Sequence, residues 1–170
     1  MAQAEGGEVS GVVELRCGAI IDAGDLARVQ PDSWYVDRVG YVCRTGSRKE
    51  RPRPTHRLHR VILDVPDGAT IDHVNGDPLD NRRQNLRVCS NRENSLNAAR
   101  SARNTSGFKG VSWARRQRRW RACIAAGALR EDGTRRNLHL GYFLAAADAA
   151  RAYDAAARQH FGEFARCNGV

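Results

Sequence analysis

Four polar side chains in the middle of the sequence are of the types that can hydrolyse a phosphodiester bond. They are the adjacent pair Asp72 and His73 and the asparagines Asn85 and Asn94. Hydrolysis needs a base that deprotonates water and positive charge that neutralises the phosphate and the leaving oxygen. A histidine suits the first task, and a divalent cation with oxygen ligands suits the second. The four residues are therefore candidates for a metal-dependent hydrolytic site.

The surrounding sequence predicts two short strands followed by a helix. We expect strands over residues 58–63 and 70–74, and a polar loop over residues 75–84 that contains Asn-Gly and Asp-Pro turn signals. Ser90 and Glu93 have the spacing of a capping box, so a helix should begin there.

Adjacent residues of an ideal strand point to opposite faces, so Asp72 and His73 can serve one site only at a strand end or a bulge. The turn signal Asn75-Gly76 directly after them favours a strand end. Taken singly, each residue is more readily explained as part of a polar surface loop. The complete set, in this order, indicates a hydrolytic site more specifically than any one of the residues does.

The set resembles the HNH homing endonucleases, in the phage and intron-encoded branch that has a ββα-metal core without zinc. The shared elements occur in order over about 40 residues. They are His59-Arg60, the turn Asp72-His73-Val74-Asn75-Gly76, the run Asp80-Asn81-Arg82-Arg83-Gln84-Asn85-Leu86, and Glu93-Asn94.

The resemblance implies a role for each candidate. His73 would be the general base, Asp72 and Asn94 would hold the metal, and Asn85 would orient the imidazole of His73. His59 would contact the phosphate or pack in the core, with packing favoured. Asn97 shares the helix face of Asn94 and would be a further polar contact.

The implied cofactor is one divalent cation, Mg²⁺ or alternatively Mn²⁺, and no small-molecule cofactor is expected. His56 and His59 have H-x-x-H spacing and could bind zinc with Cys43 and Cys89. No C-x-x-C pair occurs in the sequence, so we expect no structural zinc.

Positive charge is concentrated toward the C-terminus. Residues 104–170 carry a net charge of +7 out of the +9 of the whole chain. Such a concentration indicates a surface for a polyanion. The candidate DNA-binding residues are Lys109, Arg115, Arg116, Arg118, Arg119, Arg121, Arg135 and Arg136. A solvated basic face that only aids solubility is the alternative.

The same region predicts three strands, over residues 108–113, 120–125 and 137–142, and an alanine-rich helix over 145–160. It resembles the APETALA2-type DNA-binding domain over about 60 residues. The runs that carry the likeness are Ser106 to Trp113, Trp120-Arg121-Ala122, Leu138 to Phe143, Ala149 to Ala157 and Gly162 to Ala165. The resemblance implies a three-stranded sheet that faces the major groove, backed by one helix.

The expected fold class is α+β in three segments: a small β-rich segment at 1–56, the HNH core at 57–103 and the DNA-binding segment at 104–170. No apolar run is long enough to cross a membrane, and no secretory signal is evident. The odd number of cysteines, five, is typical of reduced thiols. We therefore expect a cytoplasmic protein of a bacterial or phage-infected cell, acting as a monomer on DNA.

The function that the sequence favours is a metal-dependent endonuclease that nicks or cleaves double-stranded DNA. One alternative is a non-enzymatic, sequence-specific DNA-binding regulator, in which the nuclease segment is only a scaffold. Another is a protein directed at RNA.

Overall fold

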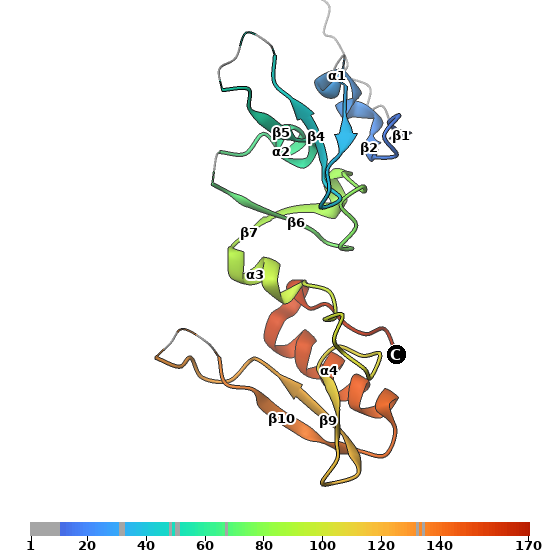
Figure 1. Ribbon diagram of the computed structural model, residues 1–170, viewed down its shortest axis with the longest axis vertical. Coiled ribbons are helices and arrows are strands. Elements are labelled where there is room, and N and C mark those ends of the chain that lie inside the picture. Colours follow the sequence, from blue (N-terminus) through green and yellow to red (C-terminus); the bar gives the residue numbers. More distant parts are fainter. Residues whose placement is uncertain are drawn as a thin grey trace, which may run out of the picture. The chain divides into compact units, whose positions relative to one another are not determined.

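The computed structural model describes residues 11–30, 33–47, 49, 52–66, 68–131, 133 and 135–170. Residues 1–10 of the expected N-terminal segment lie outside that set. The chain divides into two compact units, Met1–Asn91 and Arg92–Val170, which are described separately below. The described residues have the mixed α+β character expected, with small antiparallel sheets and few helices (Figure 1). The division into segments at residues 56 and 103 remains a prediction from composition.

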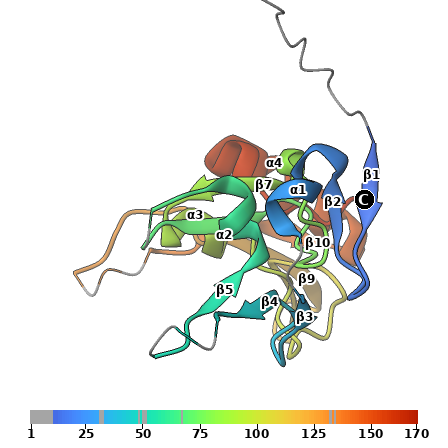
Figure 2. The same cartoon turned by 90° about the horizontal axis from the view of Figure 1, so that it is seen from above.

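The first unit consists of short strands and two short helices. Its strands form the antiparallel pairs β1–β2 and β6–β7 and the sheet β3-β4-β5. Figure 2 shows β3, β4 and β5 side by side at one end of this unit. The elements are β1 (Val12–Glu14), β2 (Ile20–Asp22), α1 (Leu26–Val29), β3 (Tyr35–Val36), β4 (Val42–Thr45), β5 (Thr55–Arg57), α2 (Leu58–Leu63), β6 (Thr70–His73) and β7 (Leu86–Cys89).

One apolar core joins the N-terminal segment to the candidate nuclease segment. Seven buried residues form it, six from β2, α1, β4, α2 and β7 and one, Ala19, directly before β2. They are Ala19, Ile21, Val29, Val42, Leu58, Ile62 and Leu86. Because both segments bury their side chains in the same core, residues 19–42 of the N-terminal segment stabilise the elements that carry the candidate site.

The expected strand over residues 58–63 is wrong, because this stretch is the helix α2. Its buried residues are Leu58, His59 and Ile62, which lie on one helical face at i, i+1 and i+4. A short apolar run does not by itself distinguish a strand from a helix. The helix ends at Asp64, whose φ of 53° is left-handed. The neighbouring strand β6 is present, as predicted.

The polar loop after β6 is fastened to the N-terminal segment. The backbone of Ile20 in β2 makes two hydrogen bonds to it, accepting from the amide of Asn81 at 2.7 Å and donating to the carbonyl of Leu79 at 2.8 Å. Arg83 forms an ion pair with the buried Asp25 at 2.6 Å, and its backbone amide donates to Asp22. The loop that follows His73 is therefore held in place by residues about sixty positions earlier.

The second unit is a three-stranded sheet of order β10-β9-β8 with one long helix against it (Figure 1). Its elements are α3 (Asn91–Leu96), β8 (Val111–Ala114), β9 (Arg119–Ile124), β10 (Leu138–Phe143) and α4 (Ala146–Phe161), followed by a 3₁₀ turn at Gly162–Phe164. This arrangement confirms the predicted sheet packed on one helix, and the predicted helix after Ser90 is present as α3.

The core of this unit lies between α4 and one face of the sheet. Val111, Ala122 and Ile124 from the strands meet Ala149, Ala150, Tyr153, Ala156 and Ala157 of α4. Small alanine side chains let the helix lie close to the sheet, as the 3.6-residue pattern predicts. Within the described residues, no helix is long and apolar enough to cross a membrane.

Candidate active site

His73 is the last residue of β6 and is buried, with 6% of its surface exposed. It pairs with Leu86 of β7, and its carbonyl accepts a hydrogen bond from the amide of Gly76 at 2.8 Å. Gly76 has a φ of 75°, which is the conformation that favours glycine in a tight turn. The strand end expected from the Asn-Gly signal is therefore present.

Two aromatic rings surround the imidazole of His73. The ring of His59 is in edge contact with it at a centroid distance of 5.2 Å. The ring of Tyr41 lies 6.1 Å from His73 and 5.6 Å from His59. Tyr41 is fixed by the β3–β4 hairpin, in which Asp37 accepts a hydrogen bond from the Tyr41 amide. His59 is 4% exposed, and its buried Nδ1 has no hydrogen-bond partner in the described structure.

The side chain of Asn81 contacts the imidazole ring of His73. Its Oδ1 lies 3.5 Å from Nε2 of His73, and Asn81 itself is fully buried. Its amide nitrogen donates to the carbonyls of Pro78 and Leu79, which fixes the oxygen toward the histidine. Asn81 therefore connects the polar loop to the imidazole.

Asn85 fastens the same loop from the other side. Its Oδ1 accepts from the backbone amide of Asn75 at 3.0 Å, and its Nδ2 donates to Asn75 and to the carbonyl of Asp80. Direct orientation of the His73 ring by Asn85 differs from this geometry, in which the ring nitrogen faces Asn81. Asn85 acts on the loop that contains Asn81, so its support of His73 is indirect.

Asp72 is buried beside His73 and is paired across the two-stranded sheet with Arg87. The guanidinium nitrogens of Arg87 lie 2.6 and 2.9 Å from one carboxylate oxygen, Oδ2. This ion pair keeps the carboxylate at a fixed position at the end of β6. A metal bound by Asp72 would share the carboxylate with Arg87.

The other predicted residues, Asn94 and Asn97, belong to the second unit. Asn94 lies in α3, and Asn97 directly follows that helix and is 5% exposed. The carbonyl of Asn97 accepts a hydrogen bond from Arg166 at 3.3 Å. A pairing of Asn94 with Asp72 around a metal stays a proposal.

The residue types fit a hard divalent cation. A carboxylate from Asp72 and an amide oxygen from Asn94 are ligands that Mg²⁺ accepts, with phosphate and water filling its remaining positions. Within the described residues, no group of three or more His, Cys, Asp or Glu side chains is placed to hold a metal ion.

Burial keeps both histidines neutral. It lowers the pKa of His73, while the contact with Asn81 and the nearby charge of Asp72 act in the opposite direction. Burial also lowers the pKa of His59, to about 3, and the neighbouring His73 adds to this effect. A neutral imidazole holds a lone pair that can accept a proton. His73 is therefore in the protonation state that a general base needs at neutral pH.

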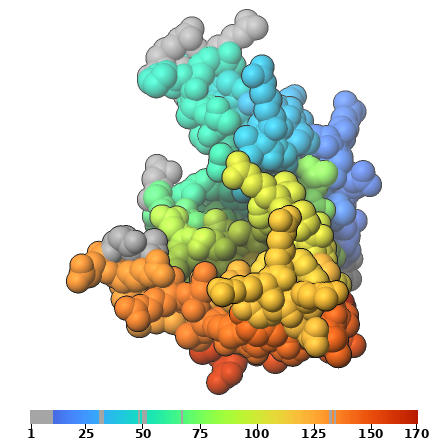
Figure 3. All heavy atoms as spheres, turned by 60° about the horizontal axis from the view of Figure 1, so that its bottom comes forward, coloured from blue at the N-terminus to red at the C-terminus, as the bar shows by residue number. Residues whose placement is uncertain are grey.

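The second unit presents a basic sheet face on the side away from α4. Along β9 the buried and exposed residues alternate, so Arg119 and Arg121 lie opposite to Ala122. Tyr142 of β10 pairs with Arg121 and is 45% exposed, and its ring lies 4.5 Å from that of His139. Figure 3 shows the region of the β8–β9 hairpin, in yellow and light orange, projecting from the surface.

The predicted DNA-binding residues differ in their accessibility. Arg115, Arg116, Arg118, Arg119 and Arg121 are all exposed on the hairpin or the outer sheet face. Lys109 instead donates from Nζ to the carbonyls of Leu96 and Ala98, at 2.7 and 2.8 Å, and burial lowers the pKa of Lys109. Its ammonium is therefore used to hold the end of α3.

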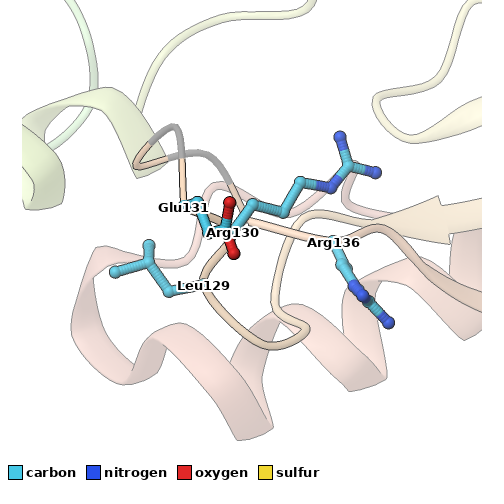
Figure 4. Close-up of a pocket in the computed structure, with 4 residues that line it drawn as sticks. All are labelled: Leu129, Arg130, Glu131 and Arg136. Carbon is cyan, nitrogen blue, oxygen red and sulfur yellow. The ribbon is translucent and has the colours of Figure 1, made fainter.

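Arg135 and Arg136 lie on the segment that leads into β10, away from the centre of the sheet. Arg135 donates to the carbonyl of Gly127, while Arg136 is exposed. Figure 4 shows Arg130 and Arg136 extending in different directions around a shallow pocket that Leu129 and Glu131 also line. These side chains do not converge on one point.

Comparison with known proteins supports a nuclease of the HNH class. Residues 56–96 match the family model described as HNH endonuclease. Protein 3.8 of Escherichia phage T7 is 38% identical over 74 residues, which are 44% of this chain and 61% of the phage protein. The uncharacterized HNH endonuclease L560 of Acanthamoeba polyphaga mimivirus is 24% identical over 140 residues, 81% of this chain and 67% of the viral protein.

The match over residues 56–96 confirms the prediction of an HNH endonuclease domain and contains His59, Asp72, His73, Asn85 and Asn94. The chain spans about three fifths of the length of the T7 protein. No solved structure matches. The family match ends at residue 96, and the likeness of the C-terminal segment to the APETALA2-type domain stays a prediction from the sequence.

Proposed function

We propose that this protein is a metal-dependent endonuclease of the homing type that nicks or cleaves double-stranded DNA, with His73 as the general base. The observation that carries the proposal is the buried, neutral imidazole of His73 at the end of β6, inside the segment that matches the HNH endonuclease family. The C-terminal sheet would bind the duplex in the manner of an APETALA2-type domain.

In the proposed reaction, His73 accepts a proton from the water that attacks the phosphodiester. Asn81 holds the imidazole from its Nε2 side, and Asn85 keeps the intervening loop in one conformation. Asp72 and Asn94 would hold one cation, Mg²⁺ or Mn²⁺, that neutralises charge on the phosphate and the leaving oxygen. Tyr41 and His59 exclude solvent from two sides of the ring.

The outer face of β8, β9 and β10 supplies the affinity for DNA. Its exposed arginines can pair with phosphates or with guanine edges, and Tyr142 offers a flat ring among them. A monomer would suffice, because the chain supplies both the cutting site and the binding sheet. Such a protein would act in the cytoplasm of a bacterial or phage-infected cell.

The experiment that tests the proposal is incubation of supercoiled plasmid containing candidate target DNA with Mg²⁺ or with a chelator. Conversion to open-circular or linear plasmid with Mg²⁺, and none with chelator, is the expected result. Protein that shifts the same DNA in a gel but leaves it intact in Mg²⁺ and in Mn²⁺ would favour the non-enzymatic regulator. Preferential binding of structured RNA over duplex DNA at fixed salt would favour the RNA-directed alternative.

A further inference from the structure

Four arginines of the candidate nuclease segment already have strong partners. Three of them pair with carboxylates, and the fourth donates to two backbone carbonyls. They are Arg82 with Asp80, Arg83 with Asp25, Arg87 with Asp72, and Arg60 with Ala69 and Pro66. Because their guanidinium groups already interact within the protein, these four side chains are poor candidates for binding a DNA phosphate.

Arg57 differs from these four. It is the last residue of β5, directly before the helix that carries His59, and it is exposed. Its guanidinium carbon lies 4.7 Å from the centre of the Tyr41 ring, which is a cation–π arrangement. Within the part of the chain that the structure describes, no carboxylate pairs with it. Its guanidinium also contacts the thiol of Cys43, where it opposes the rise in the pKa of that thiol. The two contacts hold the side chain in position without pairing its charge with a carboxylate.

Tyr41 places this charge close to the catalytic ring. The centre of the Tyr41 ring is 6.1 Å from that of His73, so the guanidinium carbon lies within about 11 Å of the imidazole. All three residues belong to the first unit: Arg57 ends β5, Tyr41 directly precedes β4, and His73 ends β6. His59 also contacts Tyr41 and contributes a buried Nδ1 without a partner, which marks unsatisfied polarity beside the ring.

We propose that Arg57, stacked on Tyr41, binds a phosphate of the DNA strand whose cleavage His73 catalyses. This inference rests on the proposed nuclease function and names a phosphate-binding residue that the sequence pattern did not single out. A guanidinium has the planar donor geometry that pairs with two phosphate oxygens. Stacking restricts the side chain before DNA binds, which lowers the entropy cost of forming that pair.

The first test measures plasmid cleavage by Arg57→Ala beside Arg16→Ala. Arg16 is an exposed arginine in the turn between β1 and β2, so it controls for the loss of one positive charge. We expect Arg57→Ala to lower kcat/KM by about 100-fold, the lower end of the range seen when one stabilising donor is removed, and Arg16→Ala to stay within twofold of wild type. Equal activity of the two variants would overturn the inference.

A small substrate separates two positions of the phosphate. Bis(p-nitrophenyl) phosphate contains a single phosphodiester and no flanking phosphates. A loss of activity on both plasmid and this ester places Arg57 on the scissile phosphate, whereas a loss on plasmid alone places it on a neighbouring one. Either result supports phosphate binding, and no loss on either substrate contradicts it.

The role of Tyr41 is tested with a double-mutant cycle. Arg57→Ala should cost less in a Tyr41→Leu background than in wild type, because the guanidinium is then no longer stacked. In a Tyr41→Phe background the aromatic face remains, and the full loss should return. The same loss in all three backgrounds would show that stacking does not position Arg57.

A binding measurement keeps the inference testable if the protein does not cut. In a His73→Ala background, Arg57→Ala should weaken DNA binding and reduce the slope of log affinity against log salt by about 0.9, the value for one phosphate contact. Arg16→Ala should leave the slope unchanged. If wild-type protein does not cut DNA but Arg57→Ala changes the slope, the nuclease proposal is refuted and the phosphate site stands. If wild-type protein cuts DNA and Arg57→Ala leaves the slope unchanged, the nuclease proposal stands and the phosphate site is refuted.

Discussion

The imidazole rings of His59 and His73 lie edge to face, with their centroids 5.2 Å apart. His59 belongs to α2, whereas His73 is the last residue of β6. Both side chains are buried, and protonation of either ring would place a cation against the other. The fold therefore favours the state in which both are neutral. This is the state that lets His73 accept a proton.

The first prediction is that acid destabilises the fold through His59. Its pKa is about 3 in the folded protein and 6.5 in an exposed chain, so between these values the unfolded state binds the proton and the folded state does not. The free energy of unfolding should fall as pH decreases from 6.5, by up to about 1.4 kcal/mol per pH unit from this group. Urea unfolding at pH 7, 6 and 5 measures this fall in the free energy of unfolding.

His59→Gln provides the control for this effect. The variant lacks the titrating ring, so its unfolding free energy should depend less steeply on pH over the same interval. An identical pH dependence in the two proteins would show that His59 is not held neutral by the fold.

The second prediction concerns Asn81. Asn81→Ala removes the oxygen that faces His73 and the amide that satisfies the carbonyls of Pro78 and Leu79. We expect a loss of about 1–3 kcal/mol in unfolding free energy, and a fall in cleavage rate at a temperature where the variant is fully folded. Thermal unfolding and plasmid nicking measure the two effects. A destabilised variant that cuts at the wild-type rate would limit Asn81 to a structural role.

The third prediction concerns Gly110, where a side chain has no room. Its φ is +74°, and an added Cβ would lie 2.1 Å from the Tyr153 ring and 2.8 Å from the carbonyl oxygen of Cys123. Gly110→Ala should destabilise the second unit by about 2–5 kcal/mol, from backbone strain and overpacking together. Gly107 has a similar φ of +83° but no atom within 4 Å of an added Cβ. Gly107→Ala should therefore cost about 1–2 kcal/mol, and equal losses by chemical unfolding would contradict the packing argument.

The fourth prediction concerns the outer sheet face. Substituting Arg119 and Arg121 together with alanine should weaken DNA binding and reduce the salt slope by about 2, if each contacts one phosphate. Arg151 and Arg158 are exposed on α4, which lies against the other face of the sheet, so their double substitution controls for net charge. Fluorescence anisotropy at several salt concentrations measures the slopes. Equal slopes in the two double variants would place the DNA elsewhere.

The second unit could be predicted from local sequence patterns. Arg119-Trp120-Arg121-Ala122 alternates between outer and inner positions, and the alanines of 146–157 recur at helical spacing. Each pattern sets which face is buried without reference to distant residues. The local pattern gave the wrong prediction for residues 58–63. This six-residue run is short and apolar enough for a strand or a helix, and it forms the helix α2.

The candidate site was predictable only where its residues share a motif. His73 and Asp72 are adjacent in the sequence, and the turn signal after them correctly indicated a strand end. Tyr41 lies more than thirty residues away and reaches His73 through the packing of the β3–β4 hairpin, which no local pattern encodes. Asn81 lay inside the quoted motif, but the direction of its side chain depends on the carbonyls of the folded loop.

The most direct test of the account compares wild-type protein with His73→Ala on supercoiled plasmid in Mg²⁺, with DNA binding measured in parallel by gel shift. The account predicts that nicking or linearisation falls by at least 100-fold, within the range for loss of a general base, while binding changes little. Cleavage by the variant at close to the wild-type rate, or a matched loss of cutting and binding, would contradict the assignment of His73 as the base.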